Sequence, residues 1–235
     1  MSNTWFRFRQ FTVSQDQCAM KVTTDACIQG AWTPMNDREQ CVLDIGAGTG
    51  LLSLMLAQRC HTAHITAIEI DEPAATQATQ NVRNSPWHQR IEIVHGDVLQ
   101  HAPDSFYDVI VCNPPFFANS LKNNQLNKTL ARHNVTLTME QLLHKVTELL
   151  APKGYFSLLL PVTEYAMWLP AAQKLGLNEV QRLDVRHHPN APVKRVVAIL
   201  AKNAVSQSEV SQLTIKDETG QYTTDFQQLL GDFYL

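Results

Sequence analysis

A strand that passes directly into a glycine turn and a helix is the feature that most constrains how this chain can fold. Residues 41–50 read CVLDIGAGTG, and LLSLMLAQRC follows at once. The apolar residues of the first segment predict a buried strand, and the second segment predicts a helix. Gly46, Gly48 and Gly50 suit the turn between them, because glycine adopts positive φ and lets a ligand approach the backbone. A strand, a tight turn and a helix in this order predict an α/β fold around a parallel sheet.

The spacing of these glycines indicates which kind of ligand the turn would accept. Dinucleotide sites use G-x-G-x-x-G, which aims a helix N-terminus at a pyrophosphate. Here the pattern is G-x-G-x-G, one residue shorter, and Asp44 stands beside it. Its carboxylate would repel a phosphate, whereas it suits an amino or sulfonium group. We therefore expect a nucleoside ligand without phosphates at this turn, and no tight binding of NAD.

Acidic residues stand at the ends of the next two expected strands. The strand at 65–71 carries Glu69, 19 residues after the last glycine of the turn. An acidic residue in this position can accept hydrogen bonds from ribose hydroxyls, and Asp71 is the competing candidate. The strand at 91–98 closes in His-Gly-Asp, where Asp97 suits either an adenine amino group or its own turn.

A fourth strand ends in the stretch that we expect to carry the chemistry. Residues 108–117 read DVIVCNPPFF, an apolar run followed by an asparagine and two prolines. Pro114 and Pro115 donate no backbone hydrogen bond, so they end the strand and hold Asn113 where open α/β sheets bind ligands. An amide oxygen and a backbone carbonyl can accept both hydrogens of a planar amine, and Phe116 can stack on a nucleobase. The alternative is a rigid turn with two buried phenylalanines.

The segments that flank these strands predict loops and helices. Residues 20–32 predict a turn and a short helix that Thr24 or Asp25 would cap. Residues 118–137 are polar and rich in asparagine, and a loop of this length inside a domain is usually functional or mobile. Thr138 then begins a helix with a capping box.

The C-terminal part predicts an antiparallel pair of strands. A helix over 163–175 comes first and is expected to kink or break near Pro170. The strands at 178–189 and 194–203 have no helix between them, so they should pair antiparallel at the sheet edge. A further strand and turn lead to a last helix that Thr223 would cap.

Composition narrows the possible partners and the compartment. The 235 residues carry a formal net charge of −3, so a nucleic-acid site would have to be a local basic patch. The sequence has no run of 18 apolar residues and no secretory signal at its N-terminus, so we expect no membrane partner. The five cysteines form no CxxC pair and the nine histidines no metal-ligand spacing. We therefore expect no metal and a cytoplasmic location.

Four motifs on successive strand ends resemble those of the class I S-adenosylmethionine-dependent methyltransferases: DIGAGTG, EID, GD and NPPF. The resemblance covers residues 40–202. It implies S-adenosyl-L-methionine as cofactor and a Rossmann-like α/β fold. Its seven-stranded sheet would be mostly parallel with the last strand antiparallel, and helices would cover both faces. The residues implied to bind the cofactor are Asp44, Gly46, Gly48 and Gly50 for the amino-acid part, Glu69 for the ribose, and Ile70 and Asp97 for the adenine.

The NPPF motif has a narrower resemblance. Asn113, Pro114, Pro115 and Phe116 match class I enzymes that methylate exocyclic or amide nitrogens. By this resemblance, Asn113 would border the cofactor, and its side chain and the Pro114 carbonyl would take the two N–H hydrogens of the target. Phe116 would stack on the target base. Guanine-N2 methyltransferases of ribosomal RNA and glutamine-N5 methyltransferases of proteins share the motif and stay open as alternatives, as does a non-enzymatic RNA-binding module.

Similarity beyond this domain extends over FRFRQFTVSQDQCAMKVTTDACIQGAW, NPPFF, ARHN and YTTDFQQLLGDFYL. These segments are similar to the bacterial tRNA adenine-N6-methyltransferases that act on adenine 37, beside the anticodon of tRNA1(Val). The resemblance implies that Thr23, Thr24 and Asp25 close the cofactor pocket. It implies a tRNA anticodon stem-loop as the partner, and it suggests no protein partner.

We expect three parts in the chain. Residues 1–35 form a segment that closes the cofactor site, residues 36–203 form the methyltransferase domain, and residues 204–235 form a strand–helix extension packed on that domain. Cations on these parts are the candidates for a local RNA-binding patch: Arg7, Arg9, Lys21, Lys122, Lys128, Arg132, Lys194 and Arg195.

Overall fold

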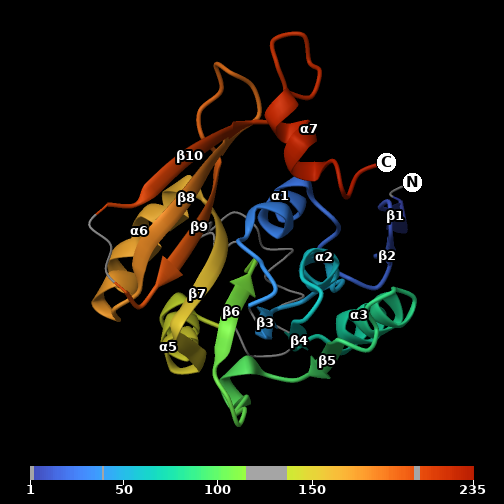
Figure 1. The fold of residues 1–235 in the computed structure, drawn as a ribbon, viewed down its shortest axis with the longest axis vertical. Coiled ribbons are helices and arrows are strands. Elements are labelled where there is room, and N and C mark those ends of the chain that lie inside the picture. The colour runs from blue at the N-terminus through green and yellow to red at the C-terminus, as the bar shows by residue number, and fades with distance from the viewer. Residues whose placement is uncertain (1–2, 39, 115–136, 204–206) are drawn as a thin grey trace.

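The computed structural model describes residues 3–38, 40–114, 137–203 and 207–235. An eight-stranded sheet runs through the molecule in the order β10-β8-β9-β7-β6-β3-β4-β5 (Figure 1). Its strands are β3 (Cys41–Ile45), β4 (His64–Glu69), β5 (Ile91–His95), β6 (Tyr107–Cys112), β7 (Leu150–Pro161), β8 (Asn178–Arg186), β9 (Arg195–Ala201) and β10 (Glu209–Thr214). A separate hairpin consists of β1 (Trp5–Arg7) and β2 (Thr12–Ser14).

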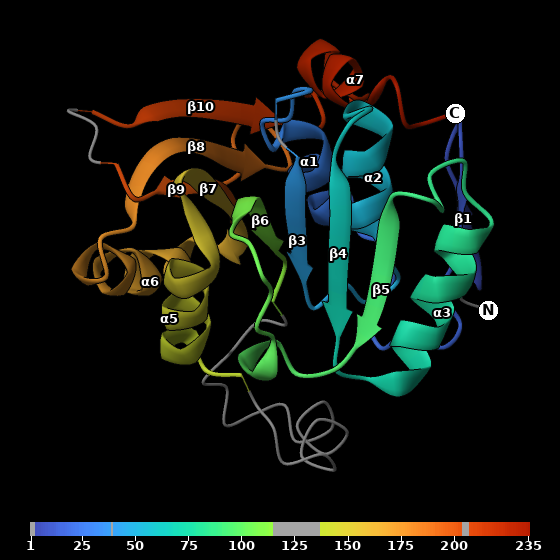
Figure 2. The ribbon, with the colours of Figure 1, turned by 60° about the horizontal axis from the view of Figure 1, so that its bottom comes forward.

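Helices cover both faces of the sheet, as the two views of Figures 1 and 2 show. One face carries the first group of helices, which are α1 (Thr24–Trp32), α2 (Leu51–Arg59), α3 (Glu72–Arg83) and α7 (Thr224–Leu230). The other face carries α5 (Met139–Leu149) and α6 (Val162–Lys174), and the short 3-10 helix η1 (Val98–Gln100) follows β5. No helix in the described ranges is long and apolar enough to cross a membrane.

Two hydrophobic cores result from the alternation of side chains along the central strands. In β6, Val109 and Val111 belong to the core beneath α1 and α2, whereas Ile110 and Cys112 belong to the core beneath α5 and α6. Successive side chains of a strand point to opposite faces, so a strand buried on both sides needs an unbroken apolar run. That run is what the sequence shows in residues 109–112.

The predicted sheet is confirmed, and the structure adds one strand to it. Strand β9 pairs antiparallel with β7 and with β8, while the pairs among β5, β4, β3, β6 and β7 are parallel. The expectation that β8 and β9 form the sheet edge is wrong, because β10 pairs parallel with β8. Leu213 and Ile215 anchor this added segment in the core with Phe226 and Leu230 of α7. The C-terminal segment thereby covers the backbone groups that β8 would otherwise expose.

The helix boundaries follow local capping chemistry. Thr138 caps α5 in a full capping box, and Thr223 caps α7, as predicted. The predicted cap of α1 is wrong by one residue, because Thr23 has the extended backbone and its side chain accepts from the Ala26 N–H. Helix α6 runs on past Pro170 to its end without a break.

The turn of the β1–β2 hairpin lies against the C-terminal segment. The Arg9 backbone N–H donates to the Phe233 carbonyl at 2.8 Å, and the Arg9 side chain donates to the Tyr234 carbonyl. The N-terminal segment therefore rests against the C-terminal one. In the C-terminal part, α7 also packs against α1, which reaches the site described next.

Candidate active site

The glycine turn lies at the carboxyl end of β3, and its backbone N–H groups donate hydrogen bonds to residues at the end of β4. Gly46 N and Ala47 N donate to the Ile68 carbonyl at 2.9 and 3.1 Å, and Gly48 N donates to Glu69 Oε2 at 2.7 Å. Gly46 and Gly48 have φ of 72° and 56°, which only glycine adopts without strain. A Cβ built on either residue would meet no atom of the described residues within 4 Å. The turn therefore offers open space directly above its backbone.

Asp44 is buried beneath this turn, inside β3 and not in the turn itself. Its Oδ2 accepts from the Ser53 N–H at 3.2 Å and from the Ser53 hydroxyl at 2.7 Å. Its Oδ1 is buried and has no hydrogen-bond partner among the described residues. Burial is the main reason that the pKa of Asp44 rises to about 6. A buried carboxylate with one unpartnered oxygen favours a cationic group as its ligand.

Glu69 ends β4 and is 9% exposed. Besides Gly48, it binds the Asp71 N–H through Oε1 at 2.9 Å. The carboxylate therefore holds the glycine turn in place, a structural role that its position in the sequence did not reveal. The competing candidate Asp71 instead caps α3, accepting from the Ala74 N–H at 3.1 Å. Glu69 thus lies directly against the glycine turn, whereas Asp71 lies at the start of α3.

The ends of β4 and β5 complete one wall of the site. Gly96 N donates to the Glu69 carbonyl at 2.9 Å, which joins the two strand ends. Ile70 is 47% exposed, so an apolar side chain faces outward beside the buried Glu69. Asp97 caps η1 by accepting from the Leu99 N–H at 2.9 Å, so the turn role considered for it is present in the structure.

The end of β6 lies next to the glycine turn. The parallel register pairs Ile45 of β3 with Cys112 of β6, so Gly46 and Asn113 are the first residues beyond two neighbouring strands. The side-chain oxygen Oδ1 of Asn113 is buried and has no hydrogen-bond partner among the described residues. Buried polar atoms in native proteins are nearly always paired, and an unpaired acceptor here points to a missing donor. Pro114, which follows, is buried.

Five of the predicted site residues lie outside the described ranges. They are Pro115, Phe116, Lys122, Lys128 and Arg132.

Helix α1 begins at the carboxyl ends of the strands. Thr24 is exposed there, and Asp25 Oδ2 forms an ion pair with Arg195 Nε at 3.0 Å. The sequence analysis assigned Asp25 to the cofactor pocket and Arg195 to the RNA-binding patch, and the structure joins the two in one ion pair. Further along α1, Gln29 is fully buried and its amide binds the Cys112 carbonyl, an interaction that the sequence analysis missed. The signal available was a glutamine inside the otherwise apolar run ACIQGAW.

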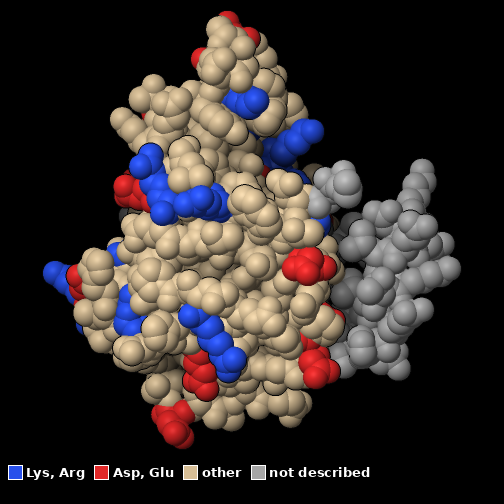
Figure 3. Space-filling view, turned by 90° about the vertical axis from the view of Figure 1, so that its right-hand side faces the viewer, with Lys and Arg blue, Asp and Glu red and all other residues tan. Residues whose placement is uncertain are grey.

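The described RNA-binding candidates lie in separate places. Arg7 and Arg9 belong to the β1–β2 hairpin, where Phe11 contacts Trp87 just before β5, toward the amino ends of the strands. Lys21 is exposed shortly before α1. Figure 3 shows Lys and Arg in several groups interspersed with Asp and Glu on the face that it draws.

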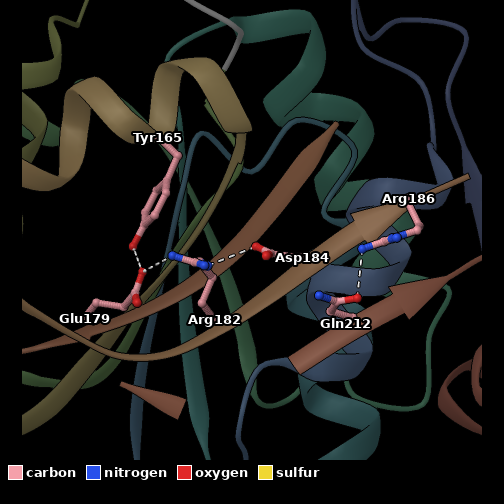
Figure 4. Close-up of polar contacts among 6 residues, drawn as sticks. All are labelled: Tyr165, Glu179, Arg182, Asp184, Arg186 and Gln212. Carbon is pink, nitrogen blue, oxygen red and sulfur yellow. Dashed lines mark hydrogen bonds and ion pairs between the residues drawn. The ribbon is translucent and has the colours of Figure 1, made fainter. Parts of the chain in front are cut away.

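Cations also gather where β8, β9 and β10 meet. Lys194 is exposed in the β8–β9 turn and its N–H donates to the Val185 carbonyl at 3.0 Å. The N–H of Lys216, after β10, donates to the His187 carbonyl at 3.0 Å. Arg186 donates to Gln212 Oε1 of β10 at 2.8 Å, as Figure 4 shows.

Figure 4 also shows a second cation, Arg182, which is flanked by carboxylates. Arg182 lies between Glu179, at 3.6 Å, and Asp184, at 2.9 Å, and Tyr165 of α6 donates to Glu179. The two carboxylates neutralise Arg182, and the hydrogen bond from Tyr165 to Glu179 ties α6 to β8. Within the described ranges, no cluster of three or more His, Cys, Asp and Glu residues could hold a metal ion.

The cofactor implied by the motifs fits these residues. An unpartnered Asp44 oxygen, an open glycine turn, a strand-end Glu69 and an exposed Ile70 follow one another along the adjacent ends of β3 and β4. They offer an acceptor for an amino group, room for a small chain, an acceptor for ribose hydroxyls and an apolar surface for a base. With this fold, the site defines a class I methyltransferase whose methyl donor is S-adenosyl-L-methionine.

Comparisons with known proteins agree with the class and narrow it. The Methyltransferase small domain family matches residues 32–159. A predicted O-methyltransferase from Agrobacterium tumefaciens has the same fold, with a TM-score of 0.71 at 18% identity over 89% of this chain and 96% of its own. A glycopeptide N-methyltransferase solved with S-adenosylmethionine has a TM-score of 0.56 at 14% identity, over 78% of this chain and 96% of its own.

Two curated relatives match over their full length. The tRNA1(Val) (adenine(37)-N6)-methyltransferase of Parabacteroides distasonis is 40% identical over 100% of this chain and 99% of its own. The protein of the same name from Dyadobacter fermentans is 42% identical over 99% of this chain and 98% of its own. The chain therefore belongs to the family of tRNA1(Val) (adenine(37)-N6)-methyltransferases.

Proposed function

We propose that this protein methylates the exocyclic N6 of adenine 37 in the anticodon loop of tRNA1(Val). The observation that carries this proposal is the buried, unpartnered Oδ1 of Asn113, one strand away from the glycine turn. It is a fixed acceptor for one hydrogen of an amino group. The family named above provides the identity of the base and the tRNA.

The reaction needs a planar aryl amine to attack an electrophilic methyl carbon in line. Bound S-adenosyl-L-methionine supplies that carbon from a sulfonium. Asn113 Oδ1 and the Pro114 carbonyl accept the two N6 hydrogens, which orients the nitrogen lone pair and raises electron density on it. Positioning of the two reactants supplies much of the rate enhancement. The proton leaves to water after the methyl transfer, and the proposal includes no general base.

The proposed cofactor contacts follow the geometry of the strand ends. Asp44 holds the amino group, the turn of Gly46, Gly48 and Gly50 admits the amino-acid part, and Glu69 takes the ribose hydroxyls. Ile70 packs on the adenine, and Asp97, with one oxygen in the η1 cap, accepts from the adenine amino group. Thr24 and Asp25 close the pocket from α1. Asp25 can serve this purpose while its other side engages Arg195.

We further propose that the tRNA stem rests on the cations at the ends of β8, β9 and β10. Lys194, Arg195, Arg186 and Lys216 lie near one another there, and the exposed Tyr222 pairs with Lys216. Arg7 and Arg9 lie toward the opposite ends of the strands, so we expect them to contribute less to the affinity for tRNA. Location in the cytoplasm, where tRNA is modified and used, accords with this partner.

A nucleotide substitution in the substrate tests the proposed target. The purified protein is incubated with labelled S-adenosyl-L-methionine and tRNA1(Val) transcripts that carry either A37 or G37, and the nucleosides are identified after digestion. We expect N6-methyladenosine from the A37 transcript and no label in the G37 transcript. Methyl on guanine N2, or label on a protein glutamine when cell extract replaces tRNA, would overturn the substrate assignment and leave the class intact.

A further inference from the structure

Gln29 links α1 to the end of β6, one residue before the proposed acceptor Asn113. Its side chain is 0% exposed. Nε2 donates to the Cys112 carbonyl at 3.0 Å and to the Ser157 carbonyl at 3.2 Å, and lies 3.4 Å from Ser157 Oγ. The Cys112 carbonyl belongs to the peptide group that also contains the Asn113 nitrogen. A hydrogen bond to that carbonyl therefore restrains the rotation of the peptide plane from which Asn113 extends.

The orientation of the Gln29 amide is determined by its surroundings. Two backbone carbonyls face Nε2, so turning the amide over would set Oε1 against two other acceptors. In the observed orientation Oε1 is buried and has no hydrogen-bond partner among the described residues. Burying an unpaired acceptor is unfavourable. A leucine or methionine would avoid that cost but would leave the Cys112 and Ser157 carbonyls without this donor, so the glutamine is explained by its hydrogen bonds and not by packing.

The same amide reaches a second buried group. Ser157 Oγ, beside Gln29, also forms a 2.7 Å hydrogen bond with Thr33 Oγ1 at the end of α1. Ser157 lies in β7 and pairs with Val111 of β6. Thr33 therefore contributes to docking α1 on the sheet, and its hydroxyl bonds Ser157 where the Gln29 amide bonds Cys112. Gln29 and Thr33 are therefore equally buried in α1 and its end, but only Gln29 bonds the peptide group before Asn113.

We infer that Gln29 is a positioning residue that sets the direction of Asn113 toward the target amine. It holds the Cys112 carbonyl from α1, so that the acceptor Oδ1 of Asn113 and the carbonyl of Pro114 face the nitrogen that is methylated. The inference rests on the proposed function, because it assigns Gln29 a purpose only if Asn113 binds the amine. Because Gln29 lies in α1, the position of this helix, which also carries Thr24 and Asp25, affects how the methyl acceptor is oriented.

The test compares Gln29→Met with Thr33→Val in steady-state and binding measurements. Gln29→Met keeps the volume and removes both donors, and Thr33→Val keeps the shape and removes one buried hydroxyl. We expect Gln29→Met to lower kcat about 10- to 100-fold, as a small misplacement of a reacting group does. KM for tRNA and the Kd for S-adenosyl-L-methionine should stay within about threefold of wild type. Thr33→Val should change kcat by less than about threefold.

A double-mutant cycle separates positioning from a general effect on the fold. If Gln29 acts mainly through Asn113, then Gln29→Met should lower kcat much less in the Asn113→Ala background than in the wild type, and the remaining loss reflects the Pro114 carbonyl. Multiplicative losses, or an equal loss in Thr33→Val, would overturn the inference and leave the proposed function standing. Full activity in Asn113→Ala alone would instead contradict the role that the proposed function gives to Asn113. Thermal melting of each variant shows that it is folded at the assay temperature.

Discussion

Replacement of Asp44 by asparagine should stabilise the free protein at neutral pH and weaken cofactor binding. The carboxylate is 1% exposed, and burial raises its pKa from 3.8 to about 6. This difference corresponds to about 3 kcal/mol of unfavourable free energy for the ionised form in the folded protein. Because the folded-state pKa lies above the unfolded one, the stability present below about pH 4 is lost as the pH rises through about 6.

The substitution removes the charge and keeps an acceptor for Ser53, so the full gain would be about 3 kcal/mol at pH 8. The new amide N–H groups replace an oxygen that is already unpaired, so only part of the about 1–3 kcal/mol cost of a buried unpaired donor is new, about 1–2 kcal/mol. We therefore expect Asp44→Asn to raise the free energy of unfolding by about 1–2 kcal/mol at pH 8. The gain should shrink as the pH falls toward 4.

Urea unfolding at several pH values, without cofactor, measures this difference directly. Isothermal titration of S-adenosyl-L-methionine should show at least tenfold weaker binding to Asp44→Asn, because the neutral amide cannot form an ion pair with a charged amino group. A control is Ser53→Ala, which removes a donor to the carboxylate and should lower stability at pH 8. A variant Asp44→Asn that is no more stable at pH 8 than wild type, or whose difference is the same at pH 4, would refute the reasoning.

Three further predictions concern the cofactor, the RNA and the sheet. Glu69→Ala should weaken S-adenosyl-L-methionine binding and lower stability, since Gly48 N loses its acceptor; unchanged affinity in calorimetry would move the ribose role to Asp71, and NAD should not bind in the same assay. Affinity for tRNA should fall steeply with salt in filter binding, since counterion release drives it, and a flat dependence would argue against the basic surface. Gly154→Ala should lower stability by about 1–3 kcal/mol, because its Cβ would lie 2.8 Å from the Asp108 carbonyl, and an unchanged melting temperature would contradict this.

The parts of the fold that sequence could predict are those encoded by local patterns. The apolar run at 109–112 and the glycines after β3 define strand ends without any knowledge of distant residues. Thr138 shows the same for helix starts, since its capping box needs only residues three positions apart. Such signals depend on neighbours along the chain, and for this reason the strands of the core sheet and its mostly parallel character were predictable.

The missed features depend on pairing between segments that are distant in the sequence. The eighth strand pairs Glu209–Thr214 with β8, and a short, partly exposed segment has no periodicity that identifies its neighbour. Glu69 was predicted at the ligand, but its hydrogen bond to Gly48 depends on how two loops meet. Gln29 and Cys112 are 83 residues apart, so their contact could not be read from spacing.

The central claim is that Asn113 presents an acceptor to the N6 amine of adenine 37. Single-turnover methyl transfer to tRNA1(Val) measures the chemical step apart from binding and product release. For Asn113→Ala we predict a rate constant about 100-fold or more below that of wild type, as for loss of an oriented hydrogen-bond group in a transition state. The affinities for tRNA and for S-adenosyl-L-methionine should stay within about threefold. A wild-type rate constant for folded Asn113→Ala, or a loss that arises wholly from weaker binding, would contradict the account.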